Sequence, residues 1–175
     1  MHVSRRAAVA TLSIAALAGS ATTAVTALGH GENHHGKDDS RHHRRVILDV
    51  PMAPSVPADQ PIHKVTAGGA PWVLKKGEAT LRQNGALRVT VRGLVIPVAP
   101  GNGTPGPVTT VTASLYCGPD SAAAVGTTPA SPIDMRGNAR MSGTITLPAK
   151  CLAPIVLVHP NGSDAAYIAA SGFGG

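Results

Sequence analysis

The sequence predicts an all-β protein, an antiparallel two-sheet sandwich that carries one disulfide. Apolar and polar side chains alternate over three separate stretches, and alternation with a period of two is typical of a strand with one buried face. Turn-forming residues separate these stretches, and no segment with a helical period follows the N-terminal region. With 175 residues, the chain has room for one ordinary domain.

Residues 1–27 are expected to be a signal peptide. Arg5 and Arg6 give a positive start, and the apolar run from Ala7 to Leu17 is too short to span a membrane. Val25-Thr26-Ala27 fits the small-x-small cleavage pattern. The arginine pair is compatible with the twin-arginine route as well as the general secretory route. We therefore expect a secreted, extracellular product with no membrane span after signal cleavage.

Residues 28–61 are expected to form a leader ahead of the β domain, which would occupy residues 62–175. The run from His30 to Arg45 contains no apolar residue that could anchor packing, which is typical of disorder. Residues 46–50 could form a first strand. Four prolines follow at positions 51, 54, 57 and 61, so residues 51–61 are interpreted as an extended linker or an edge crossing.

Three stretches of the predicted domain have the two-residue alternation. Their inward-facing residues are predicted to be Leu87, Val89 and Val91, then Val111, Ala113, Leu115 and Cys117, then Ala139, Met141, Gly143, Ile145 and Leu147. The residues between them, such as Thr112, Ser114 and Tyr116, are expected on the wet face. Asn84-Gly85 predicts a tight hairpin turn, because both residues tolerate positive φ. Residues 160–164 predict a second turn.

The two cysteines, Cys117 and Cys151, are predicted to form a disulfide. Exported chains with an even number of cysteines usually pair them, and two buried thiols are the alternative. Closing this loop would stabilise the domain by roughly 3 to 4 kcal/mol. The bond would staple a core that has few aromatic residues. The chain has no Cys-x-x-Cys motif, which argues against a redox-active disulfide.

Part of the sequence resembles the CHRD domain. The matching segments are Gly77-Glu78-Ala79-Thr80-Leu81, Leu87 to Leu94 and Val111 to Leu115, but Tyr116-Cys117 follows where that family has histidines. Residues 70–173 are also similar to small secreted actinobacterial proteins without an assigned activity. The sandwich predicted from the alternation would be immunoglobulin-like or CHRD-like, and both resemblances are compatible with it. Neither assigns a functional residue to this chain.

Metal ligands concentrate only in the leader, at His30, His34, His35, His42 and His43. Imidazole binds zinc, copper and nickel, so a flexible tract of this composition could bind such ions weakly. The alternative is a soluble charged leader that binds nothing, because a defined site needs fixed geometry. No cofactor is expected.

Nothing in the predicted domain has the pattern of an active site. His63 and His159 are its only histidines, no Gly-x-Ser-x-Gly motif accompanies them, and His159 is expected at the surface beside a turn. The carboxylates lie mostly at turns or on the predicted wet face, with no reason to pair. We therefore expect that the protein is not an enzyme, with an enzyme of unrecognised type as the remaining alternative.

The charge pattern bears on possible partners. The net charge of +6 is carried partly by the residues before Val46. From Val46 onward the chain has nine Lys and Arg residues and six Asp and Glu residues. This balance gives no reason to expect a nucleic-acid partner. Four arginines, at positions 88, 92, 136 and 140, could line one outer face, either as ordinary solvated residues or as a docking surface for an acidic wall polymer. The sequence thus favours a secreted, non-catalytic protein with a binding or structural role and an unknown extracellular or cell-wall ligand. Weak metal binding or scavenging by the leader is the alternative.

Overall fold

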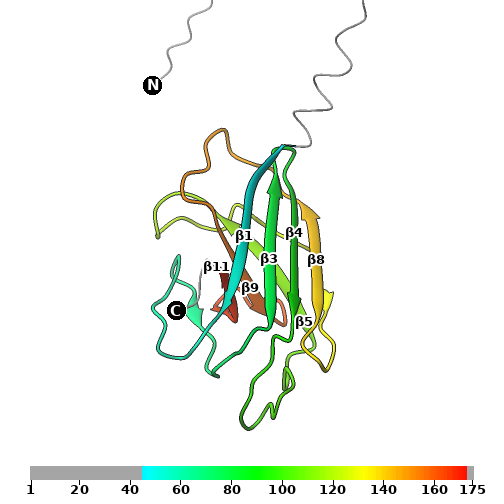
Figure 1. Ribbon diagram of the computed structural model, residues 1–175. Helices are drawn as coiled ribbons and strands as arrows, with labels where there is room; N and C mark the ends of the chain where they lie inside the picture. Colours follow the sequence, from blue (N-terminus) through cyan, green and yellow to red (C-terminus); the bar gives the residue numbers. More distant parts are fainter. Residues whose placement is uncertain (1–44, 173–175) are drawn as a thin grey trace, which may run out of the picture. The chain divides into compact units, whose positions relative to one another are not determined.

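The computed structural model describes residues 45–172, and these form eleven strands and no helix (Figure 1). None of the described residues therefore forms a helix that could cross a membrane. The strands are β1 (Val46–Pro54), β2 (Thr66–Ala67), β3 (Lys76–Arg82), β4 (Ala86–Arg92), β5 (Thr110–Tyr116), β6 (Gly126–Thr127), β7 (Ser131–Pro132), β8 (Ala139–Thr144), β9 (Ile155–Pro160), β10 (Ala166–Tyr167) and β11 (Ala169–Ser171).

Nine of these strands make one antiparallel, nearly closed sheet. Its order is β6-β5-β9-β11-β1-β3-β4-β8, and β7 pairs with β5 beside β6. In Figure 1 the half made of β1, β3, β4 and β8 lies in front of the half that contains β5, β9 and β11. Strands β2 and β10 form a separate parallel pair. The predicted antiparallel all-β class is confirmed.

Strand β1 joins the two halves of the sheet. Residues 46–51 pair with β3, and residues 52–54 pair with β11. The expected boundary at residue 62 is therefore wrong, because the β domain already includes residues 46–61. Prolines are tolerated here for a geometric reason. The carbonyl of Pro51 accepts a 3.0 Å hydrogen bond from the N–H of Gly172, which lies just after the end of β11. The N–H that Pro51 lacks would point to the same side of β1, where the hydrogen-bond ladder with β11 has already ended.

One hydrophobic core fills the space between the two halves. The inward residues predicted from alternation are confirmed, since Val89, Ala113 and Met141 are fully buried in it. The Asn84-Gly85 turn between β3 and β4 is also confirmed. Gly85 has φ of +81°, and a Cβ there would lie 1.9 Å from the carbonyl oxygen of Ile145. Only glycine fits this turn.

The outer face of β5 and β9 is buried as well, contrary to the expectation from alternation. Thr112, Ser114 and Tyr116 were expected to face water, and all three are buried. A second hydrophobic cluster covers this face, in which Tyr116 and Leu157 pack with Val65, Tyr167 and their neighbours. The covering residues come from segments far away in the sequence. The alternation of residues within β5 carries no information about packing partners that are so distant in sequence.

Candidate functional site

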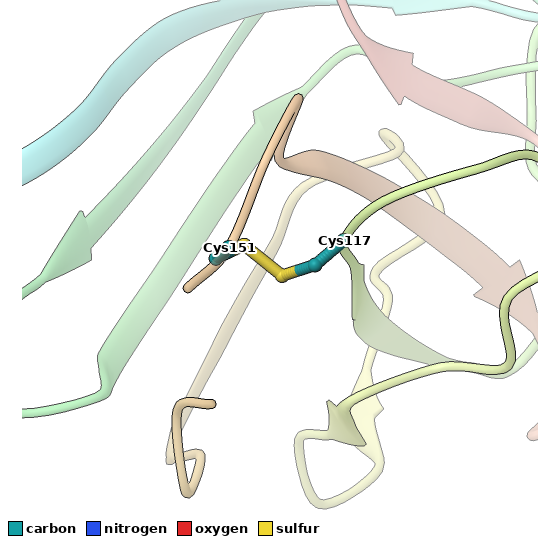
Figure 2. Close-up of a disulfide and its surroundings, with 2 residues drawn as sticks. All are labelled: Cys117 and Cys151. Atoms are coloured by element: carbon teal, nitrogen blue, oxygen red, sulfur yellow. A yellow bond between two sulfur atoms is a disulfide. The ribbon is translucent and has the colours of Figure 1, made fainter. Parts of the chain in front are cut away.

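The predicted disulfide between Cys117 and Cys151 is present (Figure 2). It connects the end of β5 with the segment that leads into β9, across a Cα–Cα distance of 4.9 Å. Both cysteines are half-buried, and Cys117 packs against the main core. A 2.7 Å hydrogen bond from Gly118 N–H to the Leu152 carbonyl ties the same two segments. The bond thus staples two segments at the edge of the core.

The five histidines proposed as metal ligands lie outside the described residues. Among residues 45–172, no group of three or more His, Cys, Asp or Glu side chains is arranged to hold a metal ion.

His159 is buried instead of lying at the surface, with only 1% of its surface exposed. Its Nδ1 lies 2.8 Å from the carbonyl oxygen of Ala166, and because a carbonyl can only accept, Nδ1 carries the hydrogen. Nε2 then holds a lone pair that has no hydrogen-bond partner. Burial lowers the pKa of His159, and this effect outweighs the hydrogen bond to Ala166 and the nearby charge of Asp164, which both raise it.

A second histidine stacks on the tyrosine beside His159. The rings of His63 and Tyr116 are 4.8 Å apart, and the rings of Tyr116 and His159 are 6.5 Å apart. The Asp120 carboxylate accepts a hydrogen bond from the backbone N–H of His63, whose φ of 51° lies in the left-handed region that few residues other than glycine adopt. Burial, followed by the charge of Asp164, raises the pKa of Tyr116. Among the described residues, neither histidine is hydrogen-bonded to a hydroxyl or thiol that could act as a nucleophile.

The outer face of the β3–β4–β8 half has a different character, and we call it the basic face. Its strands alternate strictly, so buried Gly77, Ala79 and Leu81 put every second residue of β3 toward solvent. The exposed cations of this face are Lys76, Arg82, Arg88, Arg92 and Arg140.

Three of the four arginines predicted for an outer face lie on the basic face. Arg136 does not, because it belongs to the turn after β7, where its N–H donates a 2.9 Å hydrogen bond to Asp134. Lys76 and Arg82 were not included in the prediction. The signal for them was the alternation of β3, which is as regular as that of β4.

Like charges are neighbours on the basic face. Lys76 lies directly opposite Arg92, and Arg140 lies opposite Thr90, which places it diagonally next to two arginines of β4. Like charges in such positions repel and destabilise a sheet. Glu78 offsets part of this repulsion through a 3.2 Å salt bridge with Lys76. Within the described part of the chain, Arg88, Arg92 and Arg140 have no salt bridge.

Two hollows on the basic face combine these cations with hydroxyl groups. One, of about 400 Å³, is lined by Arg82 and Arg88 together with Thr80, Ser142 and Thr144. The other, of about 180 Å³, is lined by Lys76, Glu78, Thr90, Arg92 and Arg140. Both hollows offer hydrogen-bond donors with positive charge, which is the chemistry that holds phosphate or carboxylate groups.

Comparison with known proteins gives no further assignment for these residues. No protein-family model, no curated protein and no solved structure matches the chain.

Proposed function

We propose that this protein is a secreted, non-catalytic binding protein that uses the basic face to hold an acidic polymer of the cell surface or wall. The observation that carries the proposal is the gathering of five cations, with their two hollows, on one exposed sheet face. An exposed sheet face with polar hollows suits an extended polymer better than a small molecule, which needs a concave and largely apolar pocket.

The energetics of the face support a binding role. Placing Lys76 opposite Arg92, with Arg140 diagonal to the latter, costs stability in the free protein. An anion between these side chains would remove the repulsion and would accept hydrogen bonds from guanidinium groups, which can bind oxyanions through two parallel bonds. Local arrangements that destabilise the folded protein in the absence of its ligand are expected mainly at functional sites.

Two features support the extracellular setting. The first 27 residues have the charge and hydrophobic pattern of a signal peptide. The Cys117–Cys151 disulfide is typical of proteins that fold in an oxidising compartment.

The test compares two charge-matched triple variants of the full chain. One carries Arg88→Gln, Arg92→Gln and Arg140→Gln on the basic face. The control carries Lys64→Gln, Arg136→Gln and Lys150→Gln, three exposed cations that lie in loops and turns. Binding to isolated cell walls and to their purified acidic polymers is measured by co-sedimentation and titration.

We expect the basic-face variant to lose affinity by about tenfold or more, since each exposed charge pair contributes up to about 1 kcal/mol. The control variant should bind like the wild type, apart from a small effect of net charge. Equal losses in both variants would show that the basic face has no special role. Failure of the wild-type protein to bind any acidic polymer would refute the proposed function.

A second candidate function is weak metal binding by the leader, favoured by the five histidines between positions 30 and 43. Calorimetric titration with zinc and copper would compare the mature protein with a chain that begins at Arg45. Binding by the mature protein alone supports this function, and equal heats for both chains contradict it.

A further inference from the structure

The three arginines of β4 and β8 have a regular spacing that bears on the ligand. In the β4–β8 register Arg140 faces Thr90, so Arg88 and Arg92 are its two diagonal neighbours. The Cα atoms of diagonal neighbours in an antiparallel pair lie about 7–8 Å apart, whereas Cα atoms four residues apart along one strand are separated by about 14 Å. The Cα atoms of Arg92, Arg140 and Arg88 therefore form a zigzag with nearly equal steps, and the three side chains extend from the same exposed face of the sheet.

This step matches the repeat of a phosphodiester chain. Three backbone bonds of an extended chain span about 3.3–3.6 Å, so the six bonds that separate phosphates joined by a three-carbon linker span about 7 Å. We infer, on the basis of the proposed function, that the basic face binds a polyol phosphate, with Arg92, Arg140 and Arg88 each holding one of three consecutive phosphates.

The side chains between the arginines distinguish a polyol linker from a nucleoside. Single-stranded nucleic acids have the same six-bond repeat, but the proteins that bind them stack bases on aromatic side chains. The aromatic residues of the described chain are Trp72, Tyr116 and Tyr167, and all three are buried. The basic face instead presents hydroxyl groups beside its arginines, from Thr90, Ser142 and Thr144. Hydroxyls complement the free hydroxyl of a polyol linker by donating and accepting hydrogen bonds.

The ligand test uses the full mature chain and synthetic glycerol phosphate oligomers of increasing length. Oligogalacturonate, single-stranded oligothymidylate and inorganic phosphate serve as comparison ligands at equal ionic strength. We expect affinity to rise with oligomer length up to the third phosphate and only slowly afterwards, because three arginines make the contacts. Oligogalacturonate and oligothymidylate should bind more weakly than the glycerol phosphate oligomer of equal charge.

The register test exchanges two residues of β8, Arg140→Ser together with Ser142→Arg. This double variant keeps the composition, the net charge and the basic face, but it moves the middle cation to the position opposite Arg88. Both positions are exposed, and circular dichroism verifies that the fold is kept. Arg140→Lys is the matched control, because it leaves the charge at its place in the register.

We expect the exchange to lower affinity for the glycerol phosphate trimer by about fivefold, and Arg140→Lys to lower it less. Undiminished binding by the exchanged variant would overturn the register inference while leaving the proposed function intact. Tighter binding of oligothymidylate or oligogalacturonate would overturn the choice of a polyol phosphate. Absence of binding to every polyanion would refute the proposed function itself.

Discussion

Removal of the disulfide should lower the stability of the domain by about 4 kcal/mol. The perturbation is the double substitution Cys117→Ser and Cys151→Ser. These residues are 34 positions apart, and on the chain-entropy model a loop of this length restricts the unfolded state by about 4 kcal/mol. Small domains have total stabilities of about 5–15 kcal/mol, so the loss is a large share of the whole.

Urea unfolding followed by tryptophan fluorescence measures this loss directly. Trp72 is the only tryptophan of the chain and is 4% exposed in the main core, so its emission reports global unfolding. At a typical slope of about 2 kcal/mol per molar urea, the midpoint should fall by about 2 M. Wild-type protein treated with a thiol reductant is the matched control and should show the same shift. A loss below about 1 kcal/mol in both samples would refute the loop-entropy reasoning.

Three further predictions concern other features of the fold. His159→Asn should flatten the dependence of the free energy of unfolding on pH between about pH 5 and 7, measured by chemical denaturation. In the wild type the pKa of His159 is lowered in the folded state, so unfolding takes up a proton below about pH 6.5 and the free energy of unfolding falls by up to about 1.4 kcal/mol per pH unit. An unchanged pH dependence in the variant would contradict this. Gly85→Ala should destabilise by about 3 kcal/mol or more, because its Cβ would meet the Ile145 carbonyl, whereas Gly162→Ala, at φ +70° with no atom nearby, should lose only about 1 kcal/mol in the same urea assay. A chain that begins at residue 45 should give a cooperative thermal transition, whereas one that begins at residue 62 should not, because it lacks β1; cooperative unfolding of the shorter chain would disprove the new boundary.

Much of the fold could be predicted because it depends on local patterns. Alternation in β4, β5 and β8 predicted which residues fill the main core, and Asn84-Gly85 predicted the β3–β4 turn. The disulfide was predicted from the even number of cysteines and from the expected extracellular compartment. Each of these signals lies within a few residues of the structure that it predicts, or depends only on composition.

The errors have non-local causes. The prolines of residues 51–61 argued against a strand, but the β1 ladder changes partner at Pro51, so its missing N–H faces the end of β11. His159 was expected at a surface turn, and Tyr116 on a wet face, because the residues that cover them come from distant segments such as Val65 and Tyr167. No periodicity in β5 or β9 contains that information.

The place of β1 in the sheet also constrains how the chain acquires its structure. The last residues of β1 pair with β11, so Pro54 must pair with Ala169, from which most of the domain's sequence separates it. Contacts so remote in sequence slow folding, because a long loop must close before the pairing compensates for the lost entropy. One half of the sheet can begin to assemble from β1, β3 and β4 alone. The other half is joined to β1 only when β11 pairs with both β1 and β9, so the two halves of the sheet are connected late in folding.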